Sequence, residues 1–177
     1  MNIAMPTAEL LFSEKDATPI SSDDTTIKSW KEALECLESA PKAWLSTARP
    51  DGRPHAMPLL VVLVDGVPSF ASRPGSRKST NLAASPSCVI TVSGQTLDLV
   101  IEGDATRVHD EAGLRRIADA FKAKISWEFA LRDGRAHQDD LPGSPEYAFY
   151  RLTPRRAFGY GSDGLTATRW RFDHLTL

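Results

Sequence analysis

The sequence predicts a mainly β domain, built from antiparallel strands with flanking helices. Two observations predict this class: five short apolar segments follow one another at hairpin spacing, and two amphipathic helical patterns stand beside that run. A chain of 177 residues falls within the roughly 100–200 residues of one domain. We therefore expect one antiparallel barrel or sandwich over residues 27–177, and a doubly wound parallel sheet is disfavoured.

The first 26 residues are polar and show no sustained period. They predict an N-terminal arm that is partly flexible or lies over a partner. Apolar residues at helical spacing then predict an amphipathic helix from Ile27, capped by Thr25 or Thr26 and ended before Pro41. The apolar face of this helix is expected to pack against a sheet.

Five strands are predicted next, separated by turn residues such as Asp65-Gly66 and Gly94-Gln95. Their ranges are 43–49, 54–64, 67–72, 87–93 and 96–108. Asp110 can cap a second helix, which packs on the sheet rather than carrying chemistry. Residues 127–145 are predicted to be irregular, as a lid or a simple connection, and 146–153 and 166–172 to form closing strands around a glycine-rich turn.

Composition excludes several classes of protein. The 21 basic and 23 acidic residues give a net charge of −2, so no overall field attracts nucleic acid or an anionic membrane. No apolar run approaches the roughly 20 residues that cross a bilayer, and the first 25 residues lack the order of a secretory signal. We therefore expect a cytoplasmic protein, in which Cys36 and Cys88 are buried thiols rather than a disulfide.

Two motifs fail on their context, and two others are absent. The glycine pattern over 159–164 matches a dinucleotide-binding loop, but only 13 residues follow it, so we interpret it as a loop between strands. Residues 75–79 resemble the end of a P-loop, but Arg77 stands where that loop needs glycine. The four histidines are far apart, which predicts no metal site, and no nucleophile elbow supports a hydrolase.

The segment 69–82 concentrates Arg73, Arg77 and Lys78 with several hydroxyl side chains beside a strand end. Cations, hydroxyls and the backbone N–H groups of a tight turn are the donors that bind a phosphate monoester. On composition alone, a solvated basic loop is the alternative.

The order within this segment resembles the pyridoxamine 5'-phosphate oxidase superfamily, the FMN-binding split barrels: a strand, a small polar residue, Gly-Ser-Arg-Lys and a short helix. Three other segments are similar to that family, namely Gly52–Leu59, Leu97–Gly103 and Phe158–Phe172 with its Thr168-Arg169-Trp170. Together they cover roughly residues 40–172. The resemblance implies an antiparallel split β-barrel of the FMN-binding type, and a homodimer with the flavin at the subunit interface.

The resemblance also implies a set of cofactor-binding residues. Arg77 and Lys78 would hold the FMN phosphate, with Ser72 nearby and Ala71 along the flavin. The remaining implied contacts with the ring or its surroundings are Met57, Pro58, Leu59, Asp98 and Arg169.

Some of the family's residues are replaced in this chain. Leu165 and Ala167 stand where true pyridoxamine phosphate oxidases have an Arg-x-His pair that grips the substrate. Val62 replaces a lysine and Met57 replaces an arginine of the flavin phosphate site. These differences argue against oxidation of vitamin B6 itself.

The resulting hypothesis is an FMN-dependent oxidoreductase that acts on a small molecule, with hydride transfer through flavin N5 and no assigned catalytic acid or base. The first alternative is a reductase that uses the deazaflavin F420, for which Arg73, Arg155 or Arg156 near the mouth of the site would provide extra cations. The second is a non-catalytic module that binds or senses flavin.

Overall fold

The structure, a computed structural model, describes residues 5–11, 27–162, 164 and 167–172. Within these residues the chain is dominated by antiparallel strands, as the sequence predicts. The strands are β1 (Thr7–Leu10), β2 (Ala43–Ala48), β3 (Pro54–Leu59), β4 (Val61–Val64), β5 (Val67–Ser72), β6 (Ser87–Ser93), β7 (Leu97–Arg107), β8 (Ala130–Arg132), β9 (Arg135–His137), β10 (Glu146–Gly161) and β11 (Ala167–Arg171). The helices are α1 (Trp30–Ser39), α2 (Arg77–Ala84) and α3 (Glu111–Ile125).

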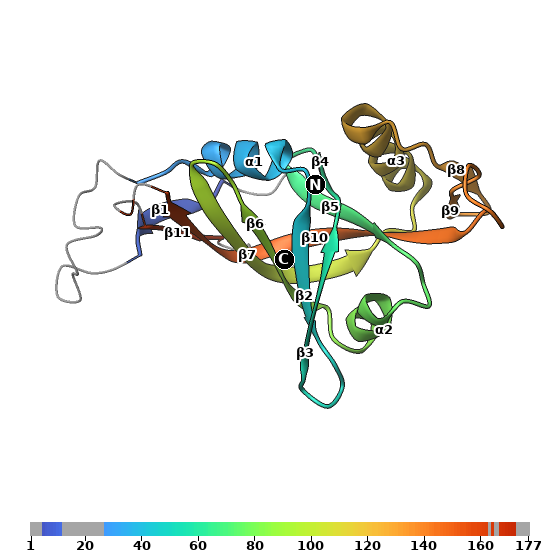
Figure 1. Cartoon of the computed structure of the whole chain (residues 1–177), viewed down its shortest axis with the longest axis horizontal. Helices are drawn as coiled ribbons and strands as arrows, with labels where there is room; N and C mark the ends of the chain where they lie inside the picture. Colours follow the sequence, from blue (N-terminus) through green and yellow to red (C-terminus); the bar gives the residue numbers. More distant parts are fainter. Residues whose placement is uncertain (1–4, 12–26, 163, 165–166, 173–177) are drawn as a thin grey trace.

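The long strand β10 runs through the middle of the sheet (Figure 1). The main path of hydrogen-bonded neighbours is β1-β11-β10-β7-β6-β2-β3. Strand β5 pairs with the first part of β10, at Ala148–Arg151, and β4 pairs with β5. Every pairing is antiparallel. Among the described residues β3 does not pair back onto β4 or β5, so the sheet stays open, and the fold is the split barrel that the resemblance implied.

Helix α1 covers one face of this sheet. It begins with a capping box, in which Ser29 and Glu32 each bond the other's backbone N–H, and it buries Trp30, Ala33 and Leu37. The predicted caps Thr25 and Thr26 are therefore wrong, because Ser29 supplies the cap three to four residues later; both threonines lie outside the described residues. The second predicted cap is confirmed, since the Asp110 carboxylate accepts the Gly113 N–H at the start of α3.

Two apolar clusters form the core. The first lies beneath α1 and includes Leu45, Ile90 and Trp170, and the second lies beneath α3 and includes Phe121 and Phe149. Strand β10 contributes side chains to both clusters. The chain therefore forms one packed body around β10, with α1 and α3 drawn along the same side in Figure 1 and α2 apart from them.

Three predicted boundaries are wrong. The strand predicted over 54–64 is two strands, because the chain changes partner at Leu60: β3 pairs with β2, whereas β4 pairs with β5. Strand β10 continues through 161 rather than ending at 153, because a bulge between Pro154 and Arg156 accommodates the proline, and a glycine at 159 leaves room for Trp170. The segment predicted to be irregular contains the short β8–β9 hairpin.

The N-terminal segment contains one strand that no sequence pattern indicated. Residues 7–10 form β1 and pair with β11, so this part of the predicted arm extends the sheet of its own chain. The rest of the arm lies outside the described residues. No described helix has the length and apolar character that crossing a membrane requires. Cys36 and Cys88 are free thiols; Cys88 is buried as predicted, whereas Cys36 is only partly buried. Burial raises the pKa of Cys88 to about 12.

The closest backbone approach in the barrel predicts the effect of one substitution. A Cβ added at Gly103 on β7 would overlap the carbonyl oxygen of Thr153 on β10 and meet Pro154 Cα at 3.0 Å. We expect Gly103→Ala to lower the free energy of unfolding by about 1–3 kcal/mol, because the two strands must separate. Urea denaturation measures this loss.

Gly75 is the matched control, because an added Cβ meets no atom within 4 Å there. Equal stability of the Gly103→Ala and Gly75→Ala variants would contradict the tight β7–β10 contact.

Candidate functional site

The turn between β5 and α2 is fixed by three serine hydroxyls. Ser72, the last residue of β5, has its Oγ 2.9 Å from Ser76 Oγ and 2.7 Å from Ser79 Oγ. Ser76 caps α2, and Ser79 donates to the carbonyl oxygen of Arg73 at 2.9 Å. These bonds hold the N-terminus of α2 against the end of β5, and with it the cations of this segment.

Helix α2 is also tied to the barrel from its buried side. Asn81 is fully buried and its Nδ2 donates to Thr47 Oγ1 on β2 at 2.9 Å. Buried polar groups need such partners, because an unpaired one costs about 1–3 kcal/mol. The position of α2 relative to the sheet is therefore set by the serines at its N-terminus and by Asn81 near its middle.

The three cations of this segment have no acidic partner. Among the described residues, no carboxylate oxygen lies within 4.0 Å of Arg73, Arg77 or Lys78, whereas Arg107, Arg132 and other arginines are paired. Arg77 is exposed, but Lys78 is half-buried. Burial lowers the pKa of Lys78 below its usual range, because its ammonium group loses solvent without gaining a counter-charge.

A groove of about 280 Å³ opens beside this turn. One part of its wall is polar and cationic, a second part is apolar, and a third is aromatic. The residues are, in that order, Ser72, Arg73, Ser76 and Lys78; Pro58, Leu59, Leu60 and Ala71; and Phe121, Trp127 and Tyr147. Such a groove can bind an anion next to a flat ring.

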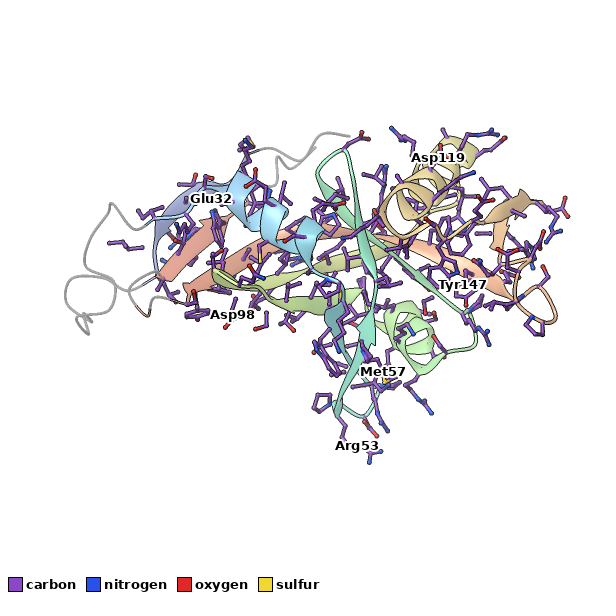
Figure 2. The ribbon with its side chains drawn as sticks, turned by 45° about the horizontal axis from the view of Figure 1, so that its top comes forward. Glu32, Arg53, Met57, Asp98, Asp119 and Tyr147 are labelled. Atoms are coloured by element: carbon purple, nitrogen blue, oxygen red, sulfur yellow. The ribbon has the colours of Figure 1, made fainter. Side chains whose placement is uncertain are left out.

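Five of the predicted site residues line this groove: Pro58, Leu59, Ala71, Ser72 and Lys78. Met57 and Arg77 are the chain neighbours of lining residues but do not line it themselves. Met57 lies on the same side of the molecule as Tyr147 and α2 (Figure 2). The structure thus gathers the strand and loop residues that the resemblance named.

The other two predicted residues lie away from the groove in the same chain. Asp98, at the start of β7, accepts a hydrogen bond from Ser93 Oγ at 2.6 Å, and Figure 2 shows it at the opposite end from Met57. Arg169 on β11 forms an ion pair with Glu9 of β1 at 2.6 Å. A single chain therefore does not bring them to the loop of Lys78.

Both outlying residues nevertheless share one face of the sheet with the groove. The antiparallel register places Pro58, Trp44, Thr91, Val100, Phe158, Arg169 and Glu9 in one cross-strand row. Asp98 lies on the same face, opposite Tyr160. We call this surface the outer face; Trp44 and Tyr160 are 46% and 42% exposed on it, while α1 covers the opposite face.

The aromatic part of the groove was missed by the sequence reasoning. Phe121 was assigned to packing, Trp127 to a polar segment, and Tyr147 to an ordinary closing strand. The signal was the run of aromatic residues at 127, 129, 147 and 149, whose side chains pack edge to face in the structure. Among the described residues, no cluster of three or more His, Cys, Asp or Glu side chains could hold a metal ion.

The sequence of this chain matches one known protein family. Residues 29–160 match the family model described as pyridoxamine 5'-phosphate oxidase. No curated protein matches the chain in sequence.

Solved structures share the fold at low sequence identity. A conserved hypothetical protein of Mycobacterium tuberculosis is 20% identical, with 81% of this chain and 91% of that chain covered and a TM-score of 0.63. A pyridoxamine 5'-phosphate oxidase-related, FMN-binding protein of Nostoc punctiforme is 20% identical, covering 79% and 85%, with a TM-score of 0.56. A haem-binding protein of Mycobacterium smegmatis is 17% identical, covering 75% and 54%, with a TM-score of 0.55.

These structures show the split-barrel fold, and the family model adds the sequence pattern that runs through the groove. It includes the strands β2 to β7, the turn of Ser72 and the helix of Lys78, and it spans about three quarters of the chain. The chain belongs to the pyridoxamine 5'-phosphate oxidase family.

Proposed function

We propose that this protein is an FMN-binding oxidoreductase that works as a cytoplasmic homodimer. The observation that carries the proposal is Lys78, a half-buried cation without a described acidic partner, at the start of α2 and on the wall of the groove. An anion bound there would supply the counter-charge that none of the described residues provides.

The residues around Lys78 fit a phosphate monoester. The backbone N–H groups of Arg77 and Lys78 lie in the first turn of α2, where no carbonyl of the helix can accept them. The partial positive charge of the helix N-terminus and the hydroxyls of Ser72 and Ser76 add to the same site. Arg77 can reach the phosphate from the solvent side, as the resemblance implies.

The apolar part of the groove fits the flavin ring. Pro58, Leu59 and Ala71 line it with small or flat apolar surfaces beside the phosphate donors. Bound FMN would supply hydride transfer through its N5 atom to or from a small molecule, while the protein holds and orients the ring. No residue of this chain is assigned as a catalytic acid or base.

A second copy of the chain would complete the site. The groove of one chain, about 280 Å³, lies just below the roughly 300–1,000 Å³ of closed ligand pockets, so a single chain would leave a flavin partly uncovered. The outer face carries exposed Trp44 and Tyr160, and it begins at Pro58 on the rim of the groove. Exposed apolar surface of this kind is typical of a protein interface.

A two-fold axis through the middle of the outer face explains the position of Arg169. In such an interface residue i of one subunit contacts residue j of the other, and the reverse also holds. Pro58 and Arg169 lie toward opposite ends of the same cross-strand row. Two-fold symmetry would therefore place Arg169 of the partner subunit near the groove, and Asp98 of the partner subunit on the same side of it.

An F420-dependent reductase is the alternative, and the ion pairs that two of its candidate arginines already form within the chain argue against it. Of the cations that would favour the longer anionic tail, only Arg73 lines the groove. Arg155 and Arg156 lie in a separate hollow with Arg169 and form ion pairs with Asp104 and Glu102. A non-catalytic flavin-binding module would share the same site and would differ only in turnover.

Titration of the purified protein with FMN, F420 and haem tests the cofactor. We expect FMN to bind, with its fluorescence quenched, and Lys78→Met to weaken it about 10- to 100-fold, because a hydrogen bond to a charged group contributes about 1.5–3 kcal/mol. Lys122→Met, at an exposed lysine of α3, is the matched control and should leave FMN affinity unchanged. Binding of haem or F420 but not FMN, or of none of the three, would overturn the proposal.

The pKa of Lys78 predicts how pH changes the stability of the ligand-free protein. Because the folded pKa lies below the unfolded value, the charged side chain destabilises the fold at neutral pH. That penalty is relieved as pH rises through the folded pKa toward the usual value near 10.5. We therefore expect the stability of Lys78→Met relative to wild type to be greatest near pH 7 and to shrink by pH 10.

Urea denaturation of both proteins at the two pH values measures this difference, and Lys42→Met, at an exposed lysine without a described carboxylate partner, corrects for general titration. A stability difference that grows with pH would mean that the Lys78 ammonium has a counter-charge in the ligand-free fold.

The dimer is tested at Trp44. We expect Trp44→Glu to yield a folded monomer, because each copy would place an unpaired carboxylate in the interface, and to weaken FMN binding about tenfold or more through loss of the contribution from Arg169 of the partner subunit. Sedimentation velocity gives the oligomeric state, and Trp44→Phe is the control. A monomeric variant with wild-type FMN affinity would show that one chain suffices for the cofactor.

A further inference from the structure

The aromatic part of the groove remains without a role once the phosphate and the flavin ring are placed. We propose that Arg73, Trp127 and Tyr147 form a subsite for a planar aromatic carboxylate, the substrate class of the enzyme. This inference rests on the proposed function, because it leaves the Lys78 side and the Pro58–Ala71 side of the groove to the cofactor.

The aromatic wall is rigid. Trp127 packs edge to face on Phe121, with ring centroids 5.9 Å apart and planes at 81°, and on Tyr147, at 5.7 Å and 70°. Phe121 is fully buried in the second apolar cluster, whereas Trp127 and Tyr147 are only partly buried. Their remaining exposed surface lines the groove, where it can stack against a flat ligand.

Backbone bonds fix Trp127 at the end of α3. Ser126 ends the helix in a left-handed conformation, with φ of 56°, and its N–H donates to the Lys122 carbonyl at 3.0 Å. The following β8–β9 hairpin is held to β10 by its pairing with Glu146 and Tyr147. The segment that the sequence left open between a lid and a simple connection is thus a structured wall of the groove.

Arg73 lies at the edge of this wall, where its charge can hold an anion. Its guanidinium carbon lies 5.8 Å from the centre of the Tyr147 ring. A cation–π contact uses the face of the guanidinium and leaves its in-plane N–H fork free, which is the geometry that binds a carboxylate through two bonds. Arg73 has no described carboxylate partner, and its backbone carbonyl accepts bonds from Ser76 N–H and Ser79 Oγ.

These features together select the ligand class. A flat conjugated ring can stack on Trp127 and meet Tyr147 edge to face, because the two ring planes lie at 70° to each other, and a carboxylate on that ring gains a charge-assisted pair with Arg73. A neutral aromatic compound lacks the second contact, and a saturated acid lacks the first. Because the aromatic wall adjoins the apolar surface assigned to the flavin, the ligand would lie against the isoalloxazine ring.

Calorimetry on the FMN-loaded protein with 2-naphthoate and its neutral analogue 2-naphthamide tests the proposal. We expect the acid to bind about tenfold or more tightly than the amide, which is the effect of one hydrogen bond to a charged group. Arg73→Gln should remove this preference, and Trp127→Leu should weaken both ligands. Arg115→Gln, at an exposed arginine of α3 outside the groove, is the matched control and should keep the preference.

Three results would overturn the subsite: no binding of the acid, equal binding of acid and amide, or a loss of FMN affinity in Arg73→Gln as large as that in Lys78→Met, which would assign Arg73 to the cofactor phosphate. A protein that fails to bind FMN but shows the Arg73-dependent preference for the acid would instead refute the proposed function and support the ligand class.

Discussion

The site depends on one small cluster of hydroxyl groups, Ser72, Ser76 and Ser79, at the junction of β5 and α2. Three bonds of the cluster are 2.7–2.9 Å long and partly or fully buried, so each is stronger than the same bond in water. The cluster turns the chain sharply from strand to helix, and this turn brings a strand end, a helix N-terminus and two cations to one wall. Without it the basic segment would be the solvated loop that its composition suggests.

The cations of this protein divide into two kinds. Most arginines on the outer face and on the β8–β9 hairpin are paired with carboxylates, and such exposed pairs contribute little to stability. Beside the groove, Arg73, Arg77 and Lys78 have no carboxylate partner in the part of the chain that the structure describes. For Lys78 this has a cost in the ligand-free fold, because its charge is partly desolvated. A group kept at such a cost is a reasonable marker of binding, since a ligand removes the penalty that the fold alone cannot.

The sequence predicts local features of this fold well and long-range ones poorly. The bounds of β5 and β6 match the prediction because alternating side chains and flanking turn residues are local signals. The break at Leu60 is a change of strand partner, which no local pattern encodes. Five of the eleven groove-lining residues could be named by resemblance, but Trp127 and Tyr147 could not. Their rings meet only because the intervening hairpin folds back, and their apolar character is typical of core packing as well.

Strand β10 joins the two apolar clusters, because Leu152 and Ala157 belong to the first and Phe149 to the second. Residues next to both clusters line the groove. Strand β5, which leads into the turn of Ser72, pairs with the first part of β10, and Phe121 belongs to the second cluster. Neither cluster can lose its packing without displacing a strand that the other one needs. Thermal or chemical unfolding is therefore expected to be a single cooperative transition, in which the binding groove is lost together with the barrel rather than before it.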